Sequence, residues 1–329
     1  MGLLKTIKKR LTNQFVGVLV YENTCIVKIR KVKNGQVLSD EEKEFDLHTK
    51  ESLTKDIVLY LQTLQEEIEQ TYISLFLNSH GQGIVPECSK SAYEKFHIEY
   101  NNVKEICVDH KYSVYASNID IKWAEKLFTG IGLDFIFSPF LMLDNLRKKE
   151  SRKQDGIVLY LLAGNNSITI MIFEKSKLLY GTFINIAKEE DLLTSDFSDD
   201  TEEDDDELLD EIDLDLELEE SDEISEILEE VNDDMKTSIQ EEDDSIKLKL
   251  FGQDLRLVKY FDASLREFYE NDLYQSDFVT HVKIYDGAQL NQDIVSYLKE
   301  QLLVDIDVRT INIADELIAL TIQEVESIA

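Results

Sequence analysis

The chain has 329 residues, with 68 Asp and Glu against 34 Lys and Arg, so its formal net charge is −34 and its pI is about 4.4. This charge disfavours a general nucleic-acid-binding function, because binding to phosphates requires a basic surface. The acidic excess is concentrated in residues 189–244, where thirty acidic residues accompany a single basic residue, Lys236. The sequence therefore predicts a nearly neutral globular protein with a polyanionic segment inserted in it.

The globular part is long enough for two domains with cores of their own. Its longest apolar runs, residues 135–143 and 157–163, are shorter than the ~18 residues that span a bilayer. The three cysteines, Cys25, Cys88 and Cys107, are odd in number and lack C-x-x-C spacing, which argues against a disulfide framework and a zinc site. Because no apolar segment typical of a secretory signal follows the basic start, we expect a cytoplasmic protein.

Residues 1–14 are predicted to form a basic, amphipathic N-terminal segment. Helical spacing places apolar side chains on one face and basic side chains on the other, which suits contact with an anionic membrane surface or a partner. The alternative is a frayed, soluble tail. The predicted contact residues are Leu3, Leu4, Lys5, Ile7, Lys8, Lys9, Arg10 and Leu11.

Residues 15–150 form the first predicted half, with an inserted subdomain around residues 80–138. Asn34-Gly35 lies between two runs of alternating, β-branched-rich sequence and predicts a hairpin. Apolar residues at helical spacing indicate the helices that follow. The predicted strands are 15–21, 25–32, a run ending at Phe45, 73–77 and 105–108, and the predicted helices are 53–68, 121–128 and 141–149.

Residues 151–329 repeat this plan and form the second predicted half. The acidic insertion, residues 189–245, follows its third strand and is predicted to be largely disordered from its composition. The alternative is a partly helical acidic arm that folds onto a basic partner or onto the Lys-rich N-terminus of the same chain. The predicted strands are 157–162, 167–173, 178–186, 279–285 and 305–311, and the predicted helices are 255–269, 293–303 and 314–325.

The order β-β-β-α-β-α-β-α is clear in the second half and partly visible in the first, and it predicts a duplicated α/β fold. It is the architecture of actin, sugar kinases and Hsp70, whose halves are ribonuclease H-like and hold a nucleotide between them. Two unrelated α/β domains are the alternative.

Several segments carry a family resemblance. The basic start runs into a first strand at Phe15–Val20, and Lys111–Ala116 and Trp123–Leu127 are followed by Gly132-Leu133 and Ser138-Pro139. This succession resembles PilM-type type IV pilus assembly proteins and the cytoplasmic domains of GspL-type secretion proteins. The segment Val282–Gly287 is similar to the adenosine-site strand of that family.

The resemblance implies an ATP site with an Asp-x-Gly hairpin in each half, where glycine lets backbone N–H groups approach phosphate. The first hairpin here is Val20–Thr24, without Gly or Asp, and Tyr160–Leu162 stands where the second motif is expected. Bulky side chains at these turns leave little space for a triphosphate and Mg²⁺. We therefore expect no required cofactor, with a vestigial nucleotide site at most, formed by Asn23, Thr24, Asn165, Ser167, Asp286 and Gly287.

Other catalytic chemistry is not indicated by the sequence. The five histidines lack metal-ligand spacing, and the segment Asn78–Gly83 has neither a G-x-S-x-G elbow nor an acid partner, so it is predicted to be an ordinary loop. The acidic insertion lacks the glycine of an EF-hand loop. No catalytic or metal-binding residue is predicted.

These observations and the resemblance lead us to expect a non-catalytic scaffold at the cytoplasmic face of the inner membrane. It would serve a type IV pilus, type II secretion or DNA-uptake (competence) machine, bind a short cytoplasmic segment of an inner-membrane assembly protein, and contact the assembly ATPase. The alternatives are a nucleotide-dependent ATPase or chaperone of the actin-like superfamily, and an FtsA- or MreB-like cytoskeletal protein.

Overall fold

The structure is a computed structural model that describes residues 12–150, 155–186, 241–302 and 304–328. Within residues 241–302, side chains are described from Arg256 onward, with the exception of Asp293. The chain divides into a unit of residues 1–187 and 256–329 and a unit of residues 188–255. Both sheets and the contacts between them belong to the first of these units.

The first sheet has five strands in the order β3-β2-β1-β4-β8. Asn34 and Gly35 both have positive φ, at 54° and 76°, which is the turn geometry that closes a two-residue hairpin between β2 and β3. Helices α2 and α4 cover one face of the sheet and share its apolar core. The elements are β1 (Thr12–Val20), β2 (Thr24–Lys33), β3 (Gln36–Asp46), α2 (Lys55–Glu67), β4 (Thr71–Phe76), α4 (Asn118–Leu127) and β8 (Phe135–Phe137).

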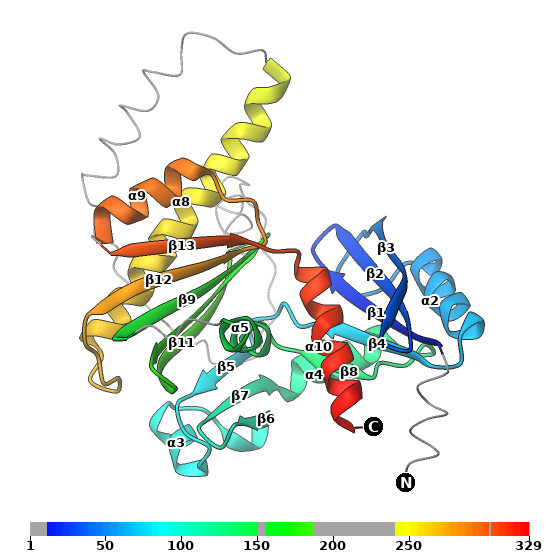
Figure 1. Ribbon diagram of the computed structural model, residues 1–329, viewed down its shortest axis with the longest axis horizontal. Coiled ribbons are helices and arrows are strands. Elements are labelled where there is room, and N and C mark those ends of the chain that lie inside the picture. Colours follow the sequence, from blue (N-terminus) through cyan, green and yellow to red (C-terminus); the bar gives the residue numbers. More distant parts are fainter. Residues whose placement is uncertain (1–11, 151–154, 187–240, 303, 329) are drawn as a thin grey trace, which may run out of the picture. The chain divides into compact units, whose positions relative to one another are not determined.

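The second sheet repeats this topology, with the order β11-β10-β9-β12-β13. In each sheet the first three strands of the chain form an antiparallel meander, and the other two strands run parallel to the first strand of that meander. Helices α8 and α9 bury apolar side chains against one face (Figure 1). The elements are β9 (Ile157–Gly164), β10 (Ser167–Glu174), β11 (Lys177–Asn185), α8 (Glu241–Glu270), β12 (Val279–Asp286), α9 (Gln292–Leu302) and β13 (Asp305–Thr310).

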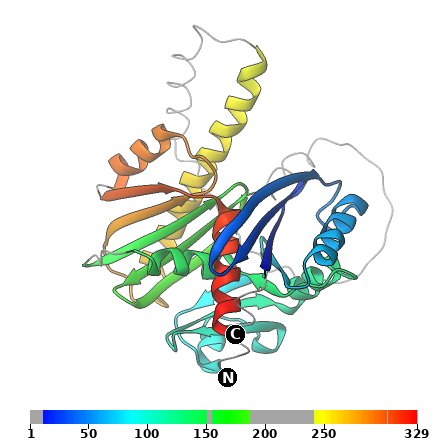
Figure 2. The ribbon, with the colours of Figure 1, turned by 45° about the vertical axis from the view of Figure 1, so that its right-hand side comes forward.

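Helices α5 (Pro139–Lys148) and α10 (Ile313–Ile328) join the two sheets in one apolar cluster. Both views of the ribbon show α10 between the sheets (Figures 1 and 2). The approach is close, because a Cβ added to Gly17 of β1 would lie 3.1 Å from Leu317 of α10. Polar contacts supplement it, since Asp315 of α10 pairs with Arg30 of β2 at 2.8 Å. The duplicated halves therefore share a central helical layer.

A small subdomain is inserted between β4 and α4. Its antiparallel sheet has the order β5-β7-β6, and its own buried cluster holds only Val85, Ala92 and Tyr93. The prediction that the cysteines form no disulfide was wrong, because Cys88 and Cys107 are bonded across this subdomain. The elements are β5 (Gln82–Val85), α3 (Lys90–Lys95), η1 (Tyr100–Asn102), β6 (Val103–Val108) and β7 (Tyr112–Ser117).

Two further predictions differ from the structure. Residues Asn78–Gly83 are not entirely loop, because β5 begins at Gln82, whose side-chain amide donates to the Leu77 and Ser79 carbonyls at 2.8 and 2.9 Å. Helix α8 begins at Glu241, earlier than predicted, and so includes the end of the predicted insertion. Among the described residues, no helix is both long enough and apolar enough to cross a bilayer.

Two sets of predicted residues lie outside the described residues. One is the N-terminal contact set, Leu3, Leu4, Lys5, Ile7, Lys8, Lys9, Arg10 and Leu11. The other is the acidic insertion from residue 189 to residue 240.

Candidate functional site

The first predicted hairpin joins β1 to β2 through Tyr21–Asn23. The Tyr21 N–H donates to the Thr24 carbonyl at 2.8 Å, and the Asn23 carbonyl accepts from the Leu47 N–H at 2.8 Å. Tyr21 is only 9% exposed, and burial, followed by the nearby Glu42 carboxylate, raises its pKa to about 12. A buried aromatic side chain thus occupies the hairpin where a phosphate-binding turn would need glycine.

The second hairpin is the turn Gly164–Ser167 between β9 and β10. Tyr160–Leu162 lie inside β9, as the predicted strand 157–162 requires, and pair with β10. Ser167 is buried, and its Oγ lies 3.0 Å from the position of a Cβ added to Gly164. Asn165 is exposed at the turn, and the Asn166 carbonyl accepts from the Ile186 N–H at 2.8 Å.

Asp286 ends β12, and its carboxylate is engaged by the backbone that follows. Its two oxygens accept from the N–H groups of Ala288 and Leu290, each at 3.0 Å, while the residue is 5% exposed. Gly287 packs closely on the start of α10, because a Cβ added to it would lie 2.7 Å from the Ile313 side chain. Asp286 therefore stabilises a turn, and Gly287 makes room for α10.

The hairpins border a cavity of about 10 Å³. A cavity of that volume has room for about one water molecule. The exposed ion pair between Lys50 Nζ and Glu22, at 3.0 Å, lies in its lining. None of the residues predicted for a nucleotide site lines this cavity, namely Asn23, Thr24, Asn165, Ser167, Asp286 and Gly287. The lining residues are Val20, Tyr21, Glu22, Lys50, Asn78, Asn166 and Asn185.

Sequence reasoning missed Lys50, Asn78 and Asn185 because they come from three separate segments, in the connection before α2, after β4 and at the end of β11. The Asn78 Oδ1 is buried and has no hydrogen-bond partner among the described residues. An unsatisfied acceptor beside a water-sized cavity suits a bound water molecule.

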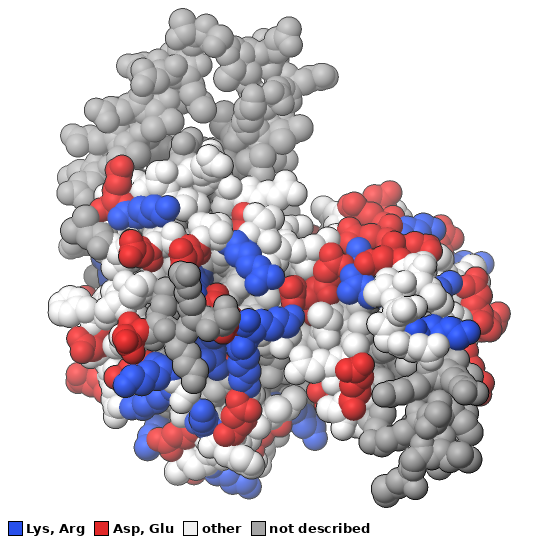
Figure 3. Space-filling model, in the orientation of Figure 1, with Lys and Arg blue, Asp and Glu red and all other residues white. Residues whose placement is uncertain are grey.

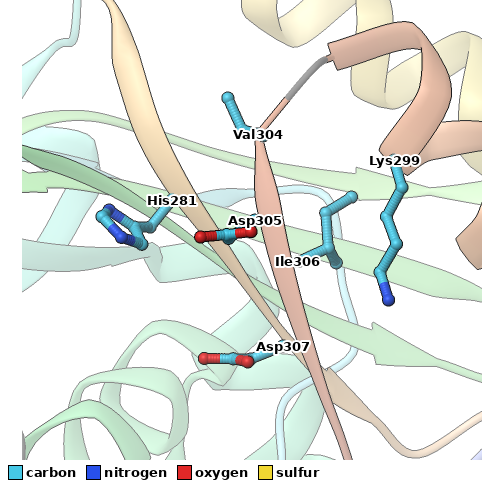
Figure 4. A pocket seen from close by; sticks show the side chains of 6 residues that line it. All are labelled: His281, Lys299, Val304, Asp305, Ile306 and Asp307. Atoms are coloured by element: carbon cyan, nitrogen blue, oxygen red, sulfur yellow. The ribbon is translucent and has the colours of Figure 1, made fainter.

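A larger, open hollow of about 480 Å³ surrounds the edge strand β13. Figure 4 shows His281, Asp305 and Asp307 on one side of this strand and Lys299 and Ile306 on the other (Figure 4). No group of three or more His, Cys, Asp or Glu side chains in the described ranges could hold a metal ion. The hollow brings together charges of both signs without a Ser or Cys nucleophile among its lining residues.

The surface near β3 is strongly acidic. Figure 3 shows Asp and Glu side chains gathered over this part of the first sheet (Figure 3). On the face toward α10, Asp40 is paired with Arg30 at 2.6 Å and with Lys28 at 3.2 Å. Charged side chains on an edge strand also discourage pairing with other chains. The exposed acidic residues of β3 are Asp40, Glu41, Glu42, Glu44 and Asp46.

The inserted subdomain is fixed to the first sheet at its base. Ser138, the residue before α5, donates from its hydroxyl to the Gln82 side chain at 2.7 Å, and both residues are buried. The Ser117 N–H donates to the Gly81 carbonyl, and a Cβ on Gly83 would clash with the Tyr115 ring. The outer strand β6 pairs with β7 alone and carries Ile106, which is 55% exposed.

Two protein families match the chain, and each match covers one of the duplicated halves. Residues 11–144 match a domain of unknown function (DUF8569), and residues 159–326 match a second domain of unknown function (DUF8341). No curated protein matches the sequence.

Solved structures share the architecture at low sequence identity. The PilM–PilN type IV pilus biogenesis complex aligns with a TM-score of 0.50 and 13% identity over 91% of this chain and 88% of that chain. A Bacteroides thetaiotaomicron protein with an actin-like ATPase fold and unknown function gives a TM-score of 0.44 and 10% identity over 98% and 99%. Together with the repeated sheet topology, the likeness to the pilus complex confirms the predicted PilM-type, duplicated actin-like fold.

Proposed function

The chain belongs to the DUF8341 family, and we propose that it is a non-catalytic scaffold of a type IV pilus or a related type II secretion or DNA-uptake machine. It binds a short cytoplasmic segment of an inner-membrane assembly protein and links that protein to the assembly ATPase. The likeness to the PilM–PilN complex supports a pilus partner of this kind.

The observation that carries the proposal is the cavity between the hairpins, with its volume of about 10 Å³. Buried Tyr21 and the Lys50–Glu22 ion pair line this cavity, beside the two turns to which the family resemblance assigns the phosphates. Asp286, the best preserved motif residue, already accepts two backbone hydrogen bonds. A scaffold needs the fold as a docking surface and does not need that space.

The inserted subdomain is the proposed docking region for the membrane partner. It is tied to the first sheet through Gln82 and Ser138, and its edge strand β6 exposes Ile106. An exposed apolar side chain next to an unpaired strand edge suits an extended peptide segment. The protein would be cytoplasmic and peripheral to the inner membrane, with the N-terminal segment as a second contact.

Affinity purification from the membranes of the native cell tests the proposal. The full-length protein should co-purify with a membrane-anchored assembly protein, and Ile106→Lys should reduce that recovery. Val37→Lys is the matched control, because Val37 is 57% exposed on a different edge strand, β3. A protein that stays monomeric and partnerless in its own cell extract contradicts the proposal.

The alternative function is that of a nucleotide-dependent ATPase or chaperone, and the retained Asp286-Gly287 at the end of β12 is the observation in its favour. Calorimetry with Mg-ATP separates it from the scaffold. For a cytoskeletal polymer of the FtsA or MreB kind, sedimentation with and without nucleotide is the corresponding test.

A further inference from the structure

The disulfide Cys88–Cys107 encloses most of the inserted subdomain's irregular part. The two residues are 19 positions apart, and α3 and η1 lie between them. Cys107 is exposed on β6 and Cys88 is half-buried, so reagents in solution can approach the bond. Cys25 is the remaining cysteine and is buried in the core of the first sheet.

Few side chains of the enclosed segment are fully buried. Only Ala92 and Tyr93 from it are fully buried, and the Tyr93 hydroxyl has no hydrogen-bond partner among the described residues. The Tyr93 ring contacts Tyr100 and Tyr115 at centroid distances of 5.2 and 5.9 Å, and the Tyr100 hydroxyl donates to Glu105 at 2.7 Å. So small a core makes the covalent link a large part of what orders this segment.

The enclosed segment also touches the second half of the protein. Phe96, directly after α3, packs on Tyr274, with ring centroids 5.9 Å apart. At its other end the segment continues into β6, the exposed edge strand. Loss of structure in this segment would therefore alter both the edge strand β6 and the contact of the subdomain with the region after α8.

We propose that Cys88–Cys107 is a redox-active cystine, a site of thiol–disulfide exchange with dithiol reductants, and that its reduction releases the segment between the two cysteines. The exchange chemistry of this cystine does not depend on the proposed scaffold function. It supplies a means by which the redox state of the surroundings changes the surface of the inserted subdomain.

The exchange proceeds in two balanced steps. A thiolate of the dithiol attacks the Sγ of Cys107, the more exposed of the two residues, the bond between the two cysteines breaks, and Cys88 leaves as a thiolate that takes up a proton. The second thiol of the reductant then loses its proton and attacks the reductant sulfur of the mixed disulfide, and Cys107 leaves as a thiolate that is protonated in turn. Two electrons pass to the protein, and the dithiol becomes a disulfide.

Cys25 is not expected to take part in this exchange. It is inaccessible between the first sheet and its helices, and burial raises the pKa of its thiol to about 12, so almost no thiolate forms at neutral pH. Cys25 therefore provides an internal control within the same chain.

Native thiol alkylation with mass detection tests the first part of the proposal on the full chain. After equilibration with glutathione disulfide, the folded protein should take up no alkyl group, and after native treatment with dithiothreitol it should take up two, at Cys88 and Cys107. Free thiols at both positions after the oxidising step, or a cystine that resists dithiothreitol in the folded protein, overturns the proposal.

Amide hydrogen exchange of the oxidised and reduced forms tests the structural part. Peptides from residues 89–106 should exchange about tenfold faster after reduction, while β1 and β4 stay unchanged. Cys25→Ser should respond as the native protein does, and the variant carrying both Cys88→Ser and Cys107→Ser should exchange fast and ignore dithiothreitol. Should that variant fail to fold, the comparison of oxidised and reduced Cys25→Ser protein still decides, and unchanged exchange in residues 89–106 overturns the proposal.

Discussion

Replacing Asp286 by Ala tests whether this residue, the best preserved part of the expected nucleotide site, stabilises the fold. Its buried carboxylate accepts two backbone hydrogen bonds at 3.0 Å. A hydrogen bond to an ionised group contributes about 1.5–3 kcal/mol. Since the released N–H groups can regain water in part, we expect the free energy of unfolding to fall by about 3 kcal/mol.

Urea unfolding followed by far-ultraviolet circular dichroism measures this loss. Asp307→Ala is the matched control, because that carboxylate is exposed on the neighbouring strand β13, and its loss should change stability by less than about 0.5 kcal/mol. Equal effects of the two substitutions would refute the structural role of Asp286. A stable Asp286→Ala protein that loses an Mg-ATP affinity present in the native chain would assign the residue to a working nucleotide site.

Three further substitutions test the packing around the hairpins and α10. Gly287→Ala should lower the free energy of unfolding by about 1–3 kcal/mol, because its Cβ would lie 2.7 Å from the Ile313 side chain. Adding Ile313→Val should restore part of this stability, as measured by thermal unfolding. Tyr21 ionises near pH 12 in the folded protein and about two pH units lower when unfolded, so the stability it contributes is present below pH 10 and is lost as the pH rises to about 12. Tyr21→Phe should therefore reduce the fall in the free energy of unfolding between these pH values, as measured by chemical unfolding. The same fall in both proteins would contradict the burial of Tyr21. Asp315→Asn removes ion pairs with Arg30 and Lys28, whose side chains are mostly buried, and should cost about 1 kcal/mol, a difference that becomes smaller in high salt.

Local sequence signals were sufficient for most of the two sheets. Asn34-Gly35 marks its hairpin because few other residues adopt positive φ at both positions, and the β-branched runs around it alternate with the period of a strand. The predicted strand 157–162 likewise lies inside β9, which ends at Gly164.

The features that matter most for the site depend on contacts distant in sequence. Tyr21, Lys50 and Asn78 meet at one cavity from three segments, and no local pattern indicates that they do. The pairing of Cys88 with Cys107 likewise depends on how β6 folds back beside the residues that follow β5, which cysteine spacing does not show. In the inserted subdomain, β5 has only the four residues Gln82–Val85, too few for periodicity to identify a strand.

Isothermal titration of the full-length protein with Mg-ATP tests whether the protein works without nucleotide, since the hairpins leave a cavity of only about 10 Å³ between them. We expect no heat of binding at millimolar nucleotide. Saturable binding in the micromolar range, lost on removal of Mg²⁺, would contradict it and favour a nucleotide-dependent protein of the same fold.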